Sequence, residues 1–283
     1  MATIGTNLAA ISAANYLTKN NDALTNSIDE LSSGSRLANP VNDAAGVAVS
    51  GNLNARIGRL QAAIQGVQDI VSYSQTVDGF LSTLESITSR LSELTQEMTN
   101  GAFGSTDRAD YTVEAAILTG QFQSIYSNAD FNGSTIFAGH ATASNIIISV
   151  NSEGTTDSLT MSNTAAVVSN VLNVILSIYS GGQSSCLTDN TIASNYIGSI
   201  NEALTSITTQ RAVINANISK FNFFIANINT ETVNVQAANS RIADLNVANE
   251  STNESKQSIL VQAATSMLAQ ANTLQQSILK LLQ

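Results

Sequence analysis

Charged residues are scarce in this sequence of 283 residues, of which they make up 11%, well below the roughly 25% of typical soluble domains. Serine, threonine, asparagine and glutamine take their place. Exposed surface normally carries charge for solubility, so uncharged polar faces indicate surface that ends up against other protein. Composition alone fits a secreted protein with a neutral polar coat equally well.

Basic residues are the rarer of the charged ones. Eleven Lys and Arg stand against 21 Asp and Glu, which gives a net charge of −10. The sequence has no cluster of Lys and Arg that could follow a phosphate backbone. We therefore expect no nucleic-acid partner.

Cysteine and histidine occur once each, as Cys186 and His140. A single cysteine excludes an internal disulfide and a cysteine-based zinc cluster. A single histidine leaves a catalytic triad one possible base and cannot supply a metal site with several histidines. We therefore expect no enzyme activity, no metal site and no cofactor.

Long apolar runs are also missing. A membrane-spanning helix needs about 18 or more apolar residues, and the longest candidate, Ala165 to Tyr179, is interrupted by Ser169, Asn170 and Asn173. The first ten residues contain no Lys or Arg, so they lack the charged region of a cleaved secretory signal. We expect no membrane insertion and, if the chain is exported, a route without a cleaved signal.

What the sequence does contain is a heptad pattern in its last third. Steps of four and three residues visit Ile200, Leu204, Ile207, Arg211, Ile214, Ile218, Phe221, Ile225, Ile228, Thr232 and Val235. Nine of these eleven positions are apolar, which indicates a long helix packed against other helices. The pattern resumes at Leu260, Ala264, Met267, Ala271, Leu274, Ile278 and Leu281.

The first third of the chain has matching apolar stripes. One runs through Ile4, Leu8, Ile11, Ala14, Leu17, Leu24, Ile28 and Leu31, and the next through Ile57, Leu60, Ile64, Val67, Val71, Val77, Leu81, Leu84 and Leu91. Chain ends usually fray, and a monomer gains little from an apolar stripe at each end unless the ends pair with each other or with neighbours. The stripes therefore favour a polymer subunit over an ordinary helical bundle.

The middle of the chain has a different pattern. Short apolar runs at 146–150 and 158–161 flank a turn-like segment at 151–154, which predicts a β-hairpin within residues 131–162. Residues 165–179 predict a short helix that ends at Gly181-Gly182. The polar segment 183–194 is interpreted as a surface loop.

Several motifs in both arms are long enough to indicate a family. The N-terminal arm contains Leu31-Ser-Ser-Gly-Ser-Arg-Leu, then Asn42-Asp-Ala-Ala-Gly-Val-Ala and Gln75-Thr-Val-Asp-Gly. The C-terminal arm contains Ser240-Arg-Ile-Ala-Asp and Met267-Leu-Ala-Gln-Ala-Asn. These motifs resemble the terminal signatures of bacterial flagellins, although Asn42 stands where the family usually has an acid and Gln275-Gln276 where it often has Pro-Gln.

Part of the N-terminal signature can be interpreted from its residues alone. Gly34 and the Asn39-Pro40 pair predict a helix break, because proline cannot donate a backbone hydrogen bond and restricts the residue before it. Asn42 or Asp43 can cap the helix that follows. The small residues at 44–46 would allow another chain to approach closely; an ordinary interhelical loop explains the breaks but not this run.

The resemblance implies a short flagellin that lacks large outer domains. Its fold class would be mainly α: an elongated helical coiled coil or bundle with a small β-hairpin region near 131–162. Residues 1–40 and 245–283 would form an inner terminal coiled-coil domain, and residues 41–244 an outer helical-bundle domain. The residues expected to pack between subunits are Leu8, Ile11, Leu31, Gly34, Arg36, Asp43, Ala44, Ala45, Gly46, Leu260, Met267, Leu274, Ile278 and Leu281.

The function implied is that of a structural subunit that polymerises into the extracellular flagellar filament for motility. Implied partners are further copies of the chain, the type III export apparatus, a flagellin chaperone and the filament cap. A host Toll-like receptor is a further possible partner, with Arg90, Glu93, Leu94 and Glu114 as contacts. Arg90 and Glu93 are equally well explained as a surface ion pair within one helix.

Two other functions remain open at this stage. A flagellar hook–filament junction protein shares the terminal coiled coil, although agreement along both arms favours flagellin. An exported adhesin or immune-signalling ligand would act as a monomer, and a species that never sediments would support it.

Overall fold

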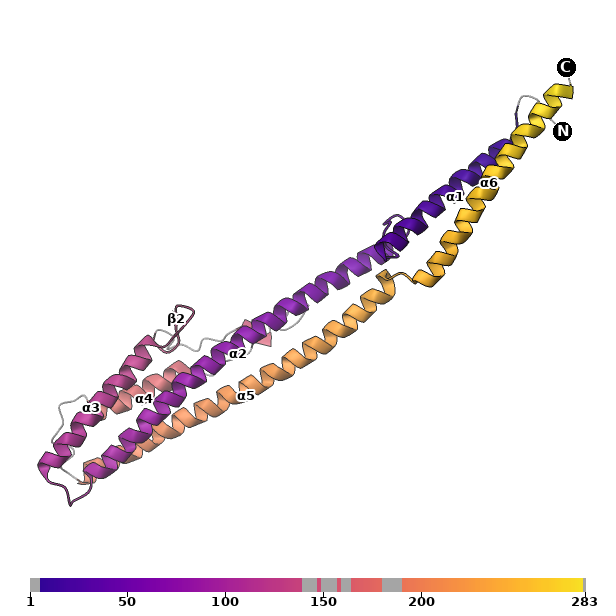
Figure 1. Ribbon diagram of the computed structural model, residues 1–283. Coiled ribbons are helices and arrows are strands. Elements are labelled where there is room, and N and C mark those ends of the chain that lie inside the picture. The colour runs from indigo at the N-terminus through magenta and orange to yellow at the C-terminus, as the bar shows by residue number, and fades with distance from the viewer. Residues whose placement is uncertain (1–5, 139–146, 149–156, 159–163, 180–189, 282–283) are drawn as a thin grey trace. The chain divides into compact units, whose positions relative to one another are not determined.

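The computed structural model describes residues 6–138, 147–148, 157–158, 164–179 and 190–281 (Figure 1). The helices are α1 (Leu8–Ser33), α2 (Ala44–Met98), α3 (Ser105–Asn128), α4 (Thr164–Tyr179), α5 (Asn190–Ala243) and α6 (Val247–Leu281). The short strands are β1 (Asp130–Phe131), β2 (Ser134–Thr135), β3 (Ile147–Ile148) and β4 (Asp157–Ser158). The predicted class, mainly helical with a small hairpin region, is confirmed.

The chain divides into two compact units. Residues 1–58 and 232–283 form one, here called the terminal unit, and residues 59–231 form the other, the central unit. The division falls within α2 and within α5, so each of these helices contributes to both units. The domain boundaries inferred from the sequence stay a prediction.

A seam with a seven-residue repeat joins α2 and α5 in the central unit. Buried residues recur every seven positions on α5, at Ile200, Ile207, Ile214, Phe221 and Ile228, and on α2 at Leu60, Val67, Ser74, Leu81, Thr88 and Thr95. This spacing keeps one stripe of each helix facing its partner along its length. The coiled-coil prediction for α5 is confirmed.

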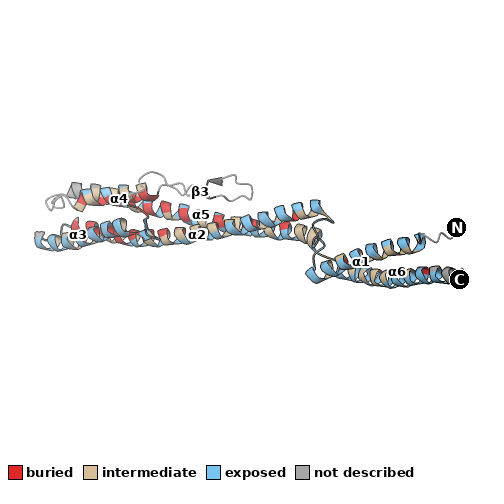
Figure 2. Cartoon of the chain, turned by 90° about the horizontal axis from the view of Figure 1, so that it is seen from above, coloured by how far each residue is buried: buried red, intermediate tan, exposed pale blue. Residues whose placement is uncertain are grey.

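The C-terminal part of α2 buries a second row of side chains, Val77, Leu84, Leu91 and Met98. These residues belong to one core cluster with Ala115 and Phe122 of α3 and with Val168, Val171 and Ile175 of α4. The second row exists because α3 and α4 cover a face of α2 that α5 alone would leave in water. Figure 2 shows the buried residues gathered along these helices of the central unit.

A tight hairpin follows α3. β1 and β2 are antiparallel, with Asp130 opposite Thr135 and Phe131 opposite Ser134. Asn132 and Gly133 form the two-residue turn and both have positive φ, 52° and 77°, as the common hairpin turn built on Asn-Gly requires. The turn places Phe131 edge-on against Tyr73 of α2, with ring centroids 5.3 Å apart.

The middle of the chain agrees in part with the sequence-based expectations. β3 and β4 pair antiparallel, with Ile147 opposite Ser158, so the predicted hairpin is confirmed, while its turn lies outside the described residues. The helix at 165–179 is confirmed as α4, and Gly181-Gly182 lies outside the described residues. The loop predicted at 183–194 is wrong from Asn190 onward, because α5 begins there. A polar composition alone does not prevent a helix from forming, and the segment 183–194 contains no glycine or proline that would break one.

Candidate functional site

The terminal unit pairs α1 with α6 along one narrow strip of each helix. The residues of α1 that are at least half-buried include Ala10, Leu17, Leu24 and Leu31, seven residues apart, and those of α6 include Gln257, Val261, Ala264, Leu268 and Ala271. Asn7 fixes the start of α1: its side chain accepts from the Ala10 N–H at 3.0 Å and donates to the Ala271 carbonyl at 3.0 Å.

The predicted apolar stripes only partly enter this seam. Leu8 and Ile11 of α1 are exposed, Leu8 by 74%. On α6, Ala264 and Ala271 are buried, whereas Leu260, Met267 and Leu274 are exposed, Met267 by 65%. Two helices cover only one strip of each other's surface, so the large residues beside that strip stay in water. The side chains of Ile278 and Leu281 lie outside the described part of the chain.

The terminal unit as a whole buries few large apolar groups. Among its described residues, Val235 is the one large apolar side chain that is buried, and the others that are buried are Ala264, Ala271, Ser27 and Ser50. Twelve large apolar side chains of this part are exposed, and Figure 2 shows α1 and α6 as mainly exposed or intermediate. Such a surface is typical of a site that binds other protein.

The turn after α1 is bound to the segment that joins α5 and α6. Gly34 ends α1 with φ of 67°, a left-handed conformation that glycine adopts without steric cost. The Arg36 N–H donates to the Ala243 carbonyl at 2.8 Å, and the Leu245 N–H donates to the Gly34 carbonyl at 3.1 Å. The signature motif Leu31–Leu37 therefore forms a joint with the segment between α5 and α6.

Arg36 and Asp43 strengthen this joint. The Arg36 guanidinium donates to the Ile242 carbonyl at 3.0 Å and to the Asp43 carboxylate at 3.1 Å. Asp43 in turn accepts from the Gly46 N–H at 2.7 Å and caps α2, as predicted. That backbone hydrogen bond, followed by Arg36, holds the pKa of the Asp43 carboxyl below its ordinary value.

Glu30 is a second acid at the joint, and its pKa is shifted in the direction opposite to that of Asp43. Partial burial, followed by repulsion from Glu250, raises the pKa of its carboxyl above the ordinary value, while a hydrogen bond from Asn42 and the charge of Arg36 act in the other direction. The joint therefore contains one acid that is favoured in its charged form and one that is disfavoured.

The small residues at 44–46 have an explanation within the chain. Ala44 and Ala45 are exposed, but a Cβ atom on Gly46 would lie 2.4 Å from the Asp43 carboxylate oxygen. A methyl group at residue 46 would therefore displace the Asp43 carboxylate that caps α2, a reason for glycine that the sequence alone did not reveal. Contact with another chain at Ala44 and Ala45 stays a prediction.

Replacing Gly46 with alanine is expected to lower the thermal midpoint of the monomer by about 2–4 °C, because the added methyl group displaces Asp43 from the start of α2. Thermal unfolding followed by circular dichroism measures the effect. Gly51→Ala in the same helix is the matched control, because a Cβ atom added at Gly51 would meet nothing within 4 Å. Equal losses, or a loss at Gly51 alone, would contradict this role for Gly46.

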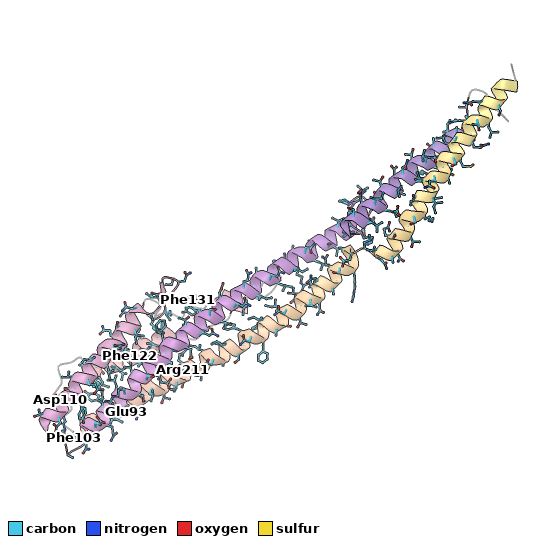
Figure 3. The ribbon with its side chains drawn as sticks, in the orientation of Figure 1. Glu93, Phe103, Asp110, Phe122, Phe131 and Arg211 are labelled. Carbon is cyan, nitrogen blue, oxygen red and sulfur yellow. The ribbon has the colours of Figure 1, made fainter. Side chains whose placement is uncertain are left out.

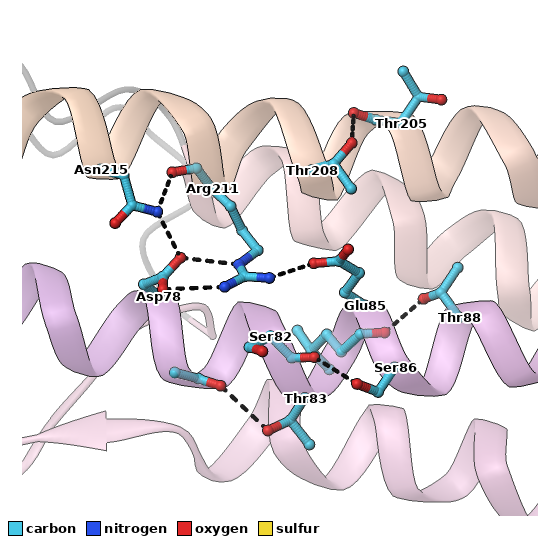
Figure 4. A network of polar contacts seen from close by, with 12 residues as sticks. Asp78, Ser82, Thr83, Glu85, Ser86, Thr88, Thr205, Thr208, Arg211 and Asn215 are labelled. Carbon is cyan, nitrogen blue, oxygen red and sulfur yellow. Dashed lines mark hydrogen bonds and ion pairs between the residues drawn. The ribbon is translucent and has the colours of Figure 1, made fainter.

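The central unit contains an ion cluster across its seam (Figure 4). Arg211 of α5 donates from Nε to one Asp78 oxygen at 2.9 Å, from Nη2 to the other at 3.2 Å, and from Nη1 to Glu85 at 2.6 Å. These hydrogen bonds raise the pKa of Arg211 above its ordinary value. In the sequence, Arg211 is one of the two polar positions of the heptad pattern, and its partners could not be predicted from that pattern.

The residues proposed to contact a host receptor do not all reach the surface. Arg90 donates to Glu114 at 2.9 Å and to Glu93 at 3.1 Å, so it joins α2 to α3. All three of these side chains are partly exposed. Leu94 is fully buried in the core and presents no surface.

Neither a metal site nor a membrane span is found in the described part of the chain. Its His, Cys, Asp and Glu residues form no group of three or more that could hold a metal ion. None of its helices is long and apolar enough to cross a membrane.

The fold and the site together define a class of helical proteins. In this class the first and last helices, here α1 and α6, pair with each other and leave large apolar side chains exposed to solvent. Comparison with known families specifies the class. The bacterial flagellin N-terminal helical region matches residues 4–142, and the bacterial flagellin C-terminal helical region matches residues 197–282. The chain therefore belongs to the bacterial flagellin family.

Individual relatives match over the whole chain. The chain is 32% identical to the flagellar filament 33 kDa core protein of Treponema phagedenis and 31% identical to flagellin FlaB2 of Treponema pallidum, with 99% of each chain covered. It is 27% identical to the flagellin of Listeria monocytogenes, again over 99% of both chains.

Proposed function

We propose that this chain is a structural subunit that polymerises with copies of itself into the bacterial flagellar filament, the extracellular polymer that serves motility. The observation that carries the proposal is the terminal unit, in which α1 and α6 pair along one narrow strip and leave Leu8, Ile11, Leu260, Met267 and Leu274 exposed. Membership of the flagellin family, which is structural and not known for enzyme activity, supports the same conclusion.

Assembly would follow from the burial of these exposed side chains. Burial of apolar surface contributes about 25 cal/mol per Å², and each subunit carries stripes on both α1 and α6. When the contacting surfaces of two copies differ and the rotation between copies does not close a ring, the contacts continue as an open helical polymer. Such a polymer requires no ligand or cofactor.

The purified chain is expected to polymerise at high concentration. Sedimentation should show a pelleting fraction that grows with concentration, and negative-stain electron microscopy should show long helical filaments. A chain that stays monomeric at every concentration and salt would favour the exported adhesin or signalling ligand. Short assemblies that form only on existing filaments or hooks would favour the junction protein.

Further partners follow from the family relationship alone. They are the flagellar export apparatus, a chaperone that covers α6 before export, and the cap at the filament tip. Contact with a host Toll-like receptor would use Arg90, Glu93 and Glu114, the predicted residues that reach the surface. Contacts between subunits at Leu31, Gly34, Arg36 and Asp43 belong to the same proposal.

A further inference from the structure

Two patches of the central unit expose large apolar side chains. The first, here called the α3 stripe, consists of Asp110, Val113, Ala116 and Ile117, which are all exposed and share one face of α3 by their spacing of three and four residues. Val113 is 59% exposed and Ile117 is 66% exposed. The second, the α5 patch, consists of Lys220 and Phe223, and Phe223 is 77% exposed.

These patches contain three of the four exposed large apolar side chains among the described residues of this unit. Among its described residues, four large apolar side chains are exposed, and Val113, Ile117 and Phe223 are the most exposed of them. Phe223 is also the most exposed aromatic side chain of the described chain. An aromatic group in this position has the properties of a binding anchor.

The two patches carry opposite charges. Asp110 is the acidic member of the α3 stripe, and Lys220 is the one lysine between residues 59 and 231. The Lys220 ammonium lies 5.6 Å from the ring centroid of Phe224, and Lys220 and Phe223 share one side of α5 by their spacing. Val113 lies three positions after Asp110 in the sequence, and Phe223 lies three positions after Lys220. Each patch therefore has one charged residue three positions before an apolar residue, and the two charges are of opposite sign.

The helix directions are compatible with this match. α3 folds back along α2, because Glu114 meets Arg90 whereas Phe131 meets Tyr73. α5 is also antiparallel to α2, because Ser92 meets Asn201 whereas Asp78 meets Arg211. α3 and α5 thus run in the same direction, which Figure 1 shows. If a second copy is shifted along the helix axis but keeps the same orientation, its α5 patch runs parallel to the α3 stripe of the first copy. Only this parallel orientation places Lys220 opposite Asp110 and Phe223 opposite Val113 at the same time.

Within one chain the two patches cannot meet. Arg90 marks the level of the α3 stripe on α2, whereas Lys220 lies nine residues beyond Arg211, which pairs with Asp78. At 1.5 Å per helical residue the patches are separated by roughly 30 Å along α2. Figure 3 places Asp110 beside Phe103, at the end of the unit where α2 turns into α3. The two patches can therefore meet each other only when they belong to different molecules.

We propose that the α5 patch of one copy docks on the α3 stripe of a neighbouring copy, with Phe223 against Val113 and Ile117 and with Lys220 facing Asp110. The two copies are displaced by roughly 30 Å along the axis of α2. Each copy offers one patch of each kind, so the contact repeats from copy to copy instead of closing a dimer. This inference rests on the proposed function, since it needs an assembled polymer.

Cysteine cross-linking tests the contact in the assembled full-length chain. The variant carries Ile117→Cys and Phe223→Cys in a Cys186→Ser background. Mild oxidation of the polymer should give a ladder of covalent multimers on a denaturing gel without reductant. Each single-cysteine variant should remain monomeric on the gel. The pair Ile117→Cys with Asn222→Cys is the matched control, because Asn222 is exposed beside Phe223 but turned to another face of α5.

Charge reversal gives a second readout that does not depend on cysteine geometry. Lys220→Glu alone and Asp110→Lys alone should each raise the critical concentration for assembly by about tenfold. The double exchange should restore most of the loss. Circular dichroism of the monomers should be unchanged, because both positions are exposed.

The outcomes separate this inference from the proposed function. If the unmodified chain does not polymerise, the proposed function fails and the inference fails with it. If the chain polymerises but forms no covalent ladder and the double exchange restores nothing, the docking contact is wrong while the filament function stands. A ladder together with rescue by the double exchange supports the contact.

Discussion

Replacing Leu260, Met267 and Leu274 with glutamine is expected to raise the critical concentration for assembly at least about 100-fold, because each side chain loses on the order of 1 kcal/mol or more of apolar burial between copies. Pairing of α1 with α6 should survive, since Val261, Ala264 and Leu268 on the seam are unchanged. Sedimentation measures assembly, and circular dichroism measures the helix content of the monomer.

Two comparisons sharpen this test. Replacing Gln262, Ser266 and Thr273, exposed polar residues on other faces of α6, with alanine should leave assembly nearly unchanged. Deleting Gln257–Gln283 should leave only monomer in the supernatant while the central unit remains helical. Filaments from the deletion variant that resemble those of the full chain would overturn the role given to α6.

Replacing Arg211 with leucine is expected to destabilise the central unit by about 2–3 kcal/mol. The three charged side chains of the cluster are only 22–29% exposed, and removing the cation leaves Asp78 and Glu85 facing each other without compensation. The thermal midpoint should fall by about 4–10 °C. Arg211→Lys should lose less, because the charge remains while the paired hydrogen bonds to Asp78 are lost.

The cluster should also specify how α2 and α5 are aligned. Their apolar seam repeats every seven residues, so a shift by one heptad would keep most apolar contacts. Arg211 meets Asp78 and Glu85, which are themselves seven residues apart, and only the observed alignment engages both. A double-mutant cycle between Arg211→Leu and Asp78→Leu should give a coupling of about 1 kcal/mol or more. Additive effects would show that the cluster does not act as a unit.

The helices were predictable from sequence wherever a repeat continued over many turns. The positions Ile200, Ile207, Ile214, Phe221 and Ile228 are buried as their spacing predicts, and α4 has the predicted bounds within one residue. Gly34 and Asp43 end and begin helices as expected, because these signals act locally.

The sequence could not show which side of an apolar stripe faces the partner helix. Leu260 and Ala264 belong to the same predicted stripe, yet only Ala264 is buried, because the narrow seam between two helices covers a single strip. The role of Gly46 depends on the position of the Asp43 carboxylate, and the partners of Arg211 lie 133 and 126 residues away. Such contacts depend on the fold and leave no local signal.

The two ends of the chain should reach full stability only in the polymer, where copies of the chain cover the exposed apolar side chains of α1 and α6. Hydrogen exchange on monomer and on filament, followed over residues 10–31 of α1 and 261–274 of α6, tests this central claim most directly. We expect protection in both segments to rise strongly on assembly, because opening them in the filament must also break contacts with neighbours. Equal protection in the two states would mean that the ends are complete within one chain, and the claim would be contradicted.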